Sequence, residues 1–135
     1  MYVLDTDILS DILKKSPSPS LLSKLADVPP ERIHTTAVNL AELYFGAYRS
    51  AHGPRILDVI RGQILPRVQI LSFDEAGAEI YGRIRAELEK RGAPRGESDL
   101  RIASIALQYR ATLVTGNVRH FAGIPGLKVE NWLAD

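Results

Sequence analysis

The sequence contains no cysteine among its 135 residues. This absence excludes a zinc–thiolate cluster, a disulfide framework and a thiol nucleophile, and it fits a reducing cytosol. No apolar run approaches the roughly 18 residues that a membrane span needs, and the chain opens on a strand-like segment and not on a leader. We therefore expect one cytoplasmic domain over residues 1–135 that is not associated with a membrane.

Several catalytic motifs are missing as well. The sequence has no Gly-x4-Gly-Lys loop, no Gly-x-Gly-x-x-Gly after its first strand, no His-Glu-x-x-His and no Gly-x-Ser-x-Gly. The three histidines, His34, His52 and His120, are too widely spaced for a zinc pattern. The net charge of +1, from 17 Lys and Arg against 16 Asp and Glu, neither demands nor excludes a nucleic-acid partner.

Basic residues are unevenly distributed near the C-terminus. No acidic residue lies between Asp99 and Glu130, and this stretch contains Arg101, Arg110, Arg119, His120 and Lys128. Two interpretations remain open, because such charges can be scattered solvated side chains or the basic rim of an acidic pocket.

Hydrophobic patterning predicts strands that alternate with helices. Strands are expected at residues 2–5, 33–35, 68–71, 111–115 and 127–130, and helices at 8–14, 20–26, 54–64, 73–91 and 98–109, with a further helix after an N-cap at Thr36. Strands separated by helices indicate an α/β fold with a central parallel sheet of four to five short strands, covered on both faces. Ligands of such sheets bind beyond the carboxyl ends of the strands.

Three acidic residues occur where an apolar segment least favours a carboxylate. Asp5 closes the run 2–4, Glu42 interrupts an apolar helix on the stripe of Val38 and Phe45, and Asp99 opens another apolar helix. Desolvating an unpaired carboxylate costs several kcal/mol, so cations or hydrogen bonds should compensate. A hard divalent ion such as Mg²⁺ is the simplest compensator.

Each acid also has a structural alternative. Asp5 can cap the helix that follows, and Asp99 can interact with the helix dipole behind an N-cap at Ser98. Glu42 can form a buried pair with an arginine. Asn117 can be a simple turn residue and His120 a surface histidine.

Four segments resemble the signature segments of PIN-domain ribonucleases, most closely the VapC-type toxins of bacterial toxin–antitoxin pairs. They are residues 3–10 around Asp5, 36–46 around Glu42, 98–103 around Asp99, and 113–121, which reads Leu-Val-Thr-Gly-Asn-Val-Arg-His-Phe. The resemblance extends over essentially the whole chain, including the ending at 124–132. It implies a three-layer α/β/α domain.

The resemblance implies a role for individual residues. Asp5, Glu42 and Asp99 would be the metal-binding carboxylates, and Thr6 and Thr115 would support the same pocket. Many relatives carry an acid at the position of Asn117 or of His120, and this chain carries neither. Asn117 can still offer a neutral oxygen, and His120, beside Arg119, can contact phosphate instead.

The implied activity is endonucleolytic, Mg²⁺- or Mn²⁺-dependent hydrolysis of structured RNA, with a homodimer and an antitoxin protein as partners. Two alternatives remain. A non-catalytic interaction module on the same fold is consistent with the missing acid in the fourth segment. A haloacid-dehalogenase-type phosphatase is suggested by Asp5-Thr6-Asp7, but the Gly-Thr that usually follows in that family is absent.

Overall fold

The computed structural model describes residues 1–134. Five short strands form one parallel sheet in the order β3-β2-β1-β4-β5. The strands are β1 (Tyr2–Leu4), β2 (Ile33–Thr36), β3 (Gln69–Leu71), β4 (Thr112–Val114) and β5 (Lys128–Glu130). The predicted α/β class with a central parallel sheet is confirmed, although most strands are one or two residues shorter than the sequence suggested.

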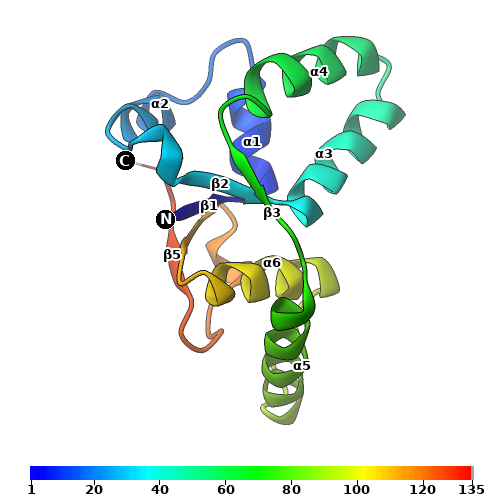
Figure 1. Ribbon diagram of the computed structural model, residues 1–135, viewed down its shortest axis with the longest axis vertical. Helices are drawn as coiled ribbons and strands as arrows, with labels where there is room; N and C mark the ends of the chain where they lie inside the picture. The colour runs from blue at the N-terminus through cyan, green and yellow to red at the C-terminus, as the bar shows by residue number, and fades with distance from the viewer. Residues whose placement is uncertain (135) are drawn as a thin grey trace.

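Helices cover both faces of the sheet and produce three layers (Figure 1). One layer holds α1 (Thr6–Ile12), α2 (Pro19–Ala26), α3 (Ala37–Arg49) and α4 (Gly53–Val59), and the other holds α5 (Glu75–Lys90) and α6 (Glu97–Gln108). Side chains of a strand alternate between the faces, so Val3 packs toward α5 and α6 and Leu4 toward the other layer. The sheet therefore separates two apolar cores.

Short helical turns complete the chain. They are the 3-10 helices η1 (Pro30–Arg32) and η3 (Val118–His120) and the π-helix η2 (Ile60–Ile64). The single helix expected at 54–64 is thus wrong in detail, because the wider π turn follows α4 and buries both Ile60 and Ile64 in the core of the α1–α4 layer.

The C-terminal segment closes the core on the α1–α4 side. The buried Trp132 packs against Tyr2 with ring centroids 5.0 Å apart, and its indole N–H donates to Glu130. This contact joins the residues after β5 to the central strand β1.

The carboxyl ends of β1, β2 and β4 lie side by side in the middle of the sheet, which brings together the residues that follow them. Asp5 extends β1 by donating its backbone N–H to Val114, and Thr115 does the same toward Glu130. Across residues 1–134, the helices are too short or too polar to cross a bilayer.

Candidate active site

Asp5 is held at the end of β1 by four hydrogen bonds. Its carboxylate accepts from the Thr6 N–H at 2.9 Å, from Asn39 Nδ2 at 2.9 Å and from the Thr115 hydroxyl at 2.8 Å, and its backbone N–H donates to Val114. Asp5 is only 6% exposed and is also the N-cap of α1. Asp5 therefore caps α1 and also lies at the centre of the polar cluster, so the two roles are not alternatives.

Asn39 and Thr6 connect Asp5 to Glu42. The Thr36 hydroxyl donates to Asn39 Oδ1 at 2.7 Å, and this fixes the amide so that Nδ2 donates to Asp5 and to Thr6 Oγ1, both at 2.9 Å. The Thr6 hydroxyl then donates to Glu42 Oε1 at 3.0 Å. Thr36 also caps α3 as predicted, by accepting from the Asn39 N–H at 3.1 Å.

Glu42 is not buried in an apolar core. Its side chain is exposed, and Phe45 on the same helix face is 65% exposed, because this face of α3 borders an open groove whose other side is lined by Ser98 and Arg101 of α6. The arginine pair considered for Glu42 is absent over residues 1–134. Partial desolvation raises the pKa of Glu42, with further increments from Asp5 and Asp99, and the Thr6 hydrogen bond acts in the opposite direction.

Asp99 lies in the first turn of α6. The N-cap of α6 is Gly96, without a side-chain cap, so the expected capping by Ser98 is wrong. His120 Nδ1 lies 3.4 Å from Asp99 Oδ2, and the Asp99 side chain is 29% exposed. Burial raises the pKa of Asp99, His120 counteracts this, and the Asp5 carboxylate adds to the rise.

Comparison with known proteins identifies the family. A model of the PIN domain matches residues 2–127 of this chain. The chain belongs to the PIN-domain family.

Curated relatives of this PIN domain carry the same kind of name. It is 35% identical over 132 residues to "Ribonuclease VapC2" of Haemophilus influenzae, with 98% of each chain covered. It is 33% identical over 131 residues to "tRNA(fMet)-specific endonuclease VapC" of Salmonella typhimurium, with 97% of each covered. Both relatives are named as nucleases, as the resemblance led us to expect, and neither name supports the phosphatase alternative.

Solved structures show the same likeness. The VapBC2 complex of Rickettsia felis, bound to a DNA fragment from its promoter, contains a chain that matches this PIN domain with a TM-score of 0.89 at 35% identity. The alignment covers 97% of this chain and 98% of that chain. The resemblance to VapC-type toxins read from the four segments is therefore confirmed.

Asp7 belongs to the same polar cluster and was not among the predicted site residues. Its carboxylate accepts from the Gly116 N–H at 2.8 Å and lies 3.5 Å from Thr115 Oγ1. A Cβ at Gly116 would stand only 2.7 Å from Asp7 Oδ2, so glycine permits this close approach. Burial and the neighbouring Asp5 raise the pKa of Asp7. Asp7 thereby ties α1 to the loop after β4.

The loop after β4 carries the other predicted residues. Asn117 is exposed, and its backbone N–H donates to Thr115 Oγ1 at 3.0 Å while its carbonyl accepts from the His120 N–H. Arg119 is exposed and makes no side-chain hydrogen bond or salt bridge to any residue in 1–134. The structure thus brings Thr115 and His120 to the carboxylates and leaves Asn117 and Arg119 at the surface beside them.

Asn39 is the other residue that was missed, and its position offered a signal. It is a polar residue one turn before Glu42 on the same helix, and it is completely buried. A polar side chain at such a position needs hydrogen-bond partners, and here they are the supporting residues of both acids.

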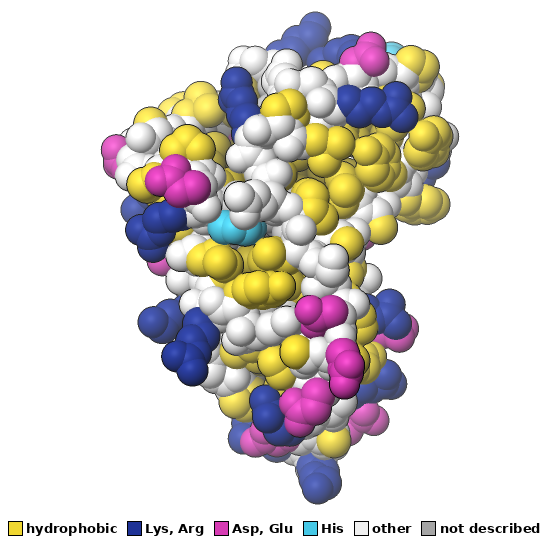
Figure 2. Space-filling model, viewed as in Figure 1, with side chains coloured by type: hydrophobic (Ala, Val, Ile, Leu, Met, Phe, Trp, Pro, Cys, Tyr) yellow, Lys and Arg dark blue, Asp and Glu magenta, His cyan; other side chains and the backbone are white. Residues whose placement is uncertain are grey.

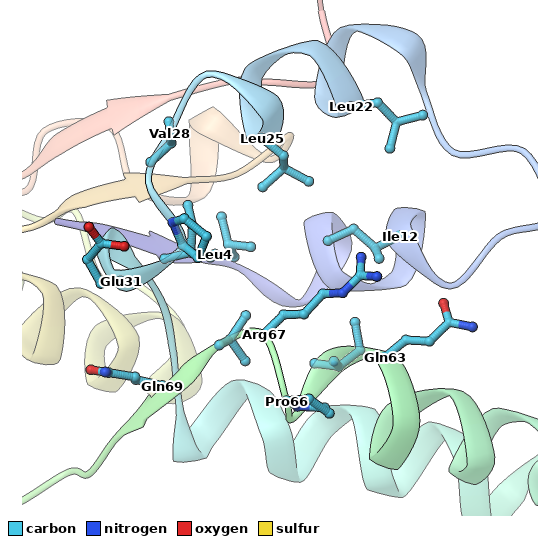
Figure 3. A pocket seen from close by; sticks show the side chains of 14 residues that line it. Leu4, Ile12, Leu22, Leu25, Val28, Glu31, Gln63, Pro66, Arg67 and Gln69 are labelled. Carbon is cyan, nitrogen blue, oxygen red and sulfur yellow. The ribbon is translucent and has the colours of Figure 1, made fainter.

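A separate cavity lies away from the carboxylates (Figure 3). It has a volume of about 600 Å³ between α2, η2 and the beginnings of β2 and β3, and its lining is mainly apolar, with Glu31 and Arg67 as its charged residues. Because this cavity lacks a set of acids or a nucleophile with a base, the cluster around Asp5 is the better candidate for chemistry.

Proposed function

We propose that this chain is a divalent-metal-dependent endoribonuclease and the toxin of a toxin–antitoxin pair. The observation that carries the proposal is the convergence of Asp5, Glu42 and Asp99 at the carboxyl ends of the strands: they are distant in sequence, yet Asp5 lies close enough to raise the pKa of both Glu42 and Asp99, beyond the effect of burial. A chain that needed only a stable fold would gain nothing from such mutual repulsion. The ribonuclease names of its relatives support the same reaction class.

The donor set fits Mg²⁺ or Mn²⁺. Carboxylate oxygens are the ligands that these ions prefer, and a cation would offset both the burial and the repulsion that raise the pKa of Glu42 and Asp99. Asp5, Glu42 and Asp99 would hold it, although no three acidic or histidine side chains within residues 1–134 already form a ligand cluster. When bound, such an ion lowers the pKa of a water and neutralises charge on the phosphodiester.

The surrounding side chains keep the carboxylates in position. Thr115 and Asn39 hold opposite oxygens of Asp5, so its ring of hydrogen bonds leaves little rotational freedom. The Thr6 hydroxyl accepts from Asn39 and donates to Glu42. The buried Asn39 amide therefore fixes the direction of the Thr6 O–H, which in turn orients the more exposed Glu42 carboxylate. This preorganisation lowers the cost of collecting three like charges.

The side chains of the fourth segment would act on the substrate. His120, next to Asp99, and Arg119, which has no salt-bridge partner within residues 1–134, can contact phosphate oxygens at the edge of the site. The site lies at an open surface, which suits a single-stranded loop of a structured RNA better than an A-form duplex, whose bases are hidden in a deep groove. We propose Asn117 as a neutral oxygen donor in this loop.

We further propose that the chain binds an antitoxin and forms a homodimer. Chains of similar fold occur in VapBC complexes, as in the Rickettsia felis structure. In this chain Phe45 and Tyr48 of α3 are 65% and 68% exposed, and large exposed aromatic side chains are typical of interaction surfaces.

A cleavage assay tests the proposed activity. The chain, purified free of any partner, should degrade total RNA in the presence of Mg²⁺ or Mn²⁺ and should stop when EDTA is added. Asp5→Asn, which keeps the shape of the side chain but removes its charge, should be inactive while melting cooperatively. If the wild-type chain binds RNA or an antitoxin but never cleaves with metal, it is a non-catalytic interaction module.

A further inference from the structure

A groove opens from the proposed active site between α1 and the pair α3 and α4. It has a volume of about 780 Å³. Thr6 and Glu42, the hydrogen-bonded pair of the candidate site, line this groove together with side chains farther along α1 and α3. A ligand in the groove would therefore be continuous with a ligand in the site.

The rim of this groove is basic. Lys14, Lys15, Arg49 and Arg55 line it, and Glu42 is the one acid among its lining residues. Lys14 pairs with Asp11 at 3.0 Å, but the other three cations have no salt-bridge partner within residues 1–134. A cluster of unneutralised cations, from α3, α4 and the segment after α1, attracts a polyanion and gains little from the fold itself.

The charge distribution differs in the opposite layer. On the face shown in Figure 2, most acidic side chains lie over the layer of α5 and α6. Several arginines of that layer are neutralised within their own helix, as in the pairs of Arg83 with Glu79 and Arg85 with Glu89. The rim of the groove differs from that layer, because Lys15, Arg49 and Arg55 have no such partner within residues 1–134.

The wall and floor of the groove suit a nucleic-acid strand. The floor is apolar, with Leu13, Leu43 and Ile56 among its residues, and can receive bases while the rim receives phosphates. Arg49 lies over the exposed Phe45 ring, with its guanidinium carbon 5.3 Å from the ring centroid, so this cation is positioned without being neutralised.

Gly46 lines the groove without a side chain and so leaves space there. It lies within α3, where glycine weakens a helix, yet a Cβ at this position would meet no atom within 4 Å. Packing therefore does not require glycine here. Since Gly46 lines the groove, any larger side chain would project into the space that a ligand would fill.

We propose that this groove binds the phosphodiester backbone of a single-stranded RNA segment that continues from the bond to be cleaved. The proposal rests on the proposed ribonuclease function and adds the location of the substrate. Lys15, Arg49 and Arg55 contact phosphates, and Gly46 allows the strand to approach α3. An acidic protein segment is negatively charged, as RNA is, and could also bind these cations. The groove, however, is continuous with Glu42 of the proposed active site, and this favours the RNA substrate.

Binding without cleavage tests this assignment. The probe is a fluorescein-labelled oligouridylate of about 12 nucleotides, within the usual range for one single-strand site, titrated by anisotropy in EDTA at several salt concentrations. The variants are the double substitution Arg49→Gln/Arg55→Gln and the single substitution Gly46→Gln. The control is Arg83→Gln, which removes an exposed arginine of α5 in the opposite layer.

The double variant should bind the probe more weakly, and the slope of log K against log salt should fall by about 1.4, at about 0.7 for each lost phosphate contact. Gly46→Gln should melt at the same or a higher temperature and yet bind more weakly, which a structural role of Gly46 would not produce. Arg83→Gln should match the wild-type chain in both measurements.

Three outcomes overturn the proposal. If wild-type chain cleaves RNA but the double variant keeps wild-type affinity and slope, the groove is not the RNA site, while the ribonuclease function stands. If poly-L-glutamate competes for the groove as well as the oligouridylate does, the occupant is an acidic protein segment. If the wild-type chain neither binds nor cleaves RNA, the proposed function and the groove assignment fail together.

Discussion

Asn39 donates from its Nδ2 to Asp5 Oδ1 across 2.9 Å, and this bond joins α3 to the end of the central strand β1. Asn39 is completely buried, and its amide oxygen is fixed by the Thr36 hydroxyl at 2.7 Å. The orientation of the Asp5 carboxylate, a proposed metal ligand, thus depends on the uncharged side chain of Asn39.

Asn39→Ala should lower both stability and activity. The substitution removes one of the two donors to Asp5 Oδ1 and leaves the buried Thr36 O–H without its acceptor, which costs about 1–3 kcal/mol of unfolding free energy. Cleavage should fall as well, because Asp5 and Thr6 lose a shared donor. Urea unfolding and single-turnover cleavage measure the two effects, with the exposed Gln63→Ala as control. A loss of stability with unchanged cleavage would reduce Asn39 to a purely structural residue.

Glu42→Gln should leave the metal-free chain as stable or make it more stable near neutral pH. Burial, with Asp5 and Asp99, raises the pKa of Glu42 in the folded state. Between its ordinary and raised pKa, the folded chain binds more protons than the unfolded chain, so this group lowers stability as pH rises through the folded pKa. The advantage of the variant should therefore be greater at about pH 7.5 than at about pH 5.

Urea unfolding of both chains in EDTA at the two pH values provides the comparison. Glutamine retains an oxygen that can accept from Thr6, so the hydrogen bond at 3.0 Å is preserved and the comparison isolates the charge. A large loss of metal-free stability in Glu42→Gln, at either pH, is the result that this interpretation does not allow.

Asn117→Asp should tighten the binding of divalent metal. Asn117 lies in the loop whose backbone N–H groups contact Thr115 and Asp7, near the carboxylates, and an acid here adds negative charge to the same region. Calorimetric titration with Mn²⁺ should show a higher affinity and, where the added charge recruits a second ion, a higher stoichiometry. Equal affinity and stoichiometry in both chains would return Asn117 to the role of a turn residue.

The arrangement of strands was predictable from the sequence because it depends on local patterns. Buried apolar runs such as Leu113 and Val114, separated by helices, indicate a parallel sheet, and the ends of parallel strands meet at one edge. That rule brings together the residues that follow β1 and β4, and Thr115 accordingly donates to Asp5 across 2.8 Å. The N-cap at Thr36 was equally local and is also confirmed.

Features that depend on tertiary neighbours were not predictable in this way. Glu42 and Phe45 have the periodicity of a buried helix face, but whether such a face is covered depends on which elements pack on it, and here Glu42 and Phe45 are left exposed beside an open groove. The contact of Asp7 with Gly116 joins residues 109 positions apart and leaves no local pattern. The π-helix η2 is set by how Ile60 and Ile64 reach the core.

The most direct measurement is the rate of RNA cleavage by Asp99→Asn as the concentration of Mg²⁺ is increased. Asparagine keeps the size of the side chain but removes one of the three charges that would hold the ion, so cleavage should be abolished while cooperative melting persists. The melting temperature of the wild-type chain should rise with Mg²⁺ and that of the variant should not. Cleavage by Asp99→Asn at close to the wild-type rate would contradict the metal site and leave Asp99 as a residue that interacts only with the dipole of α6.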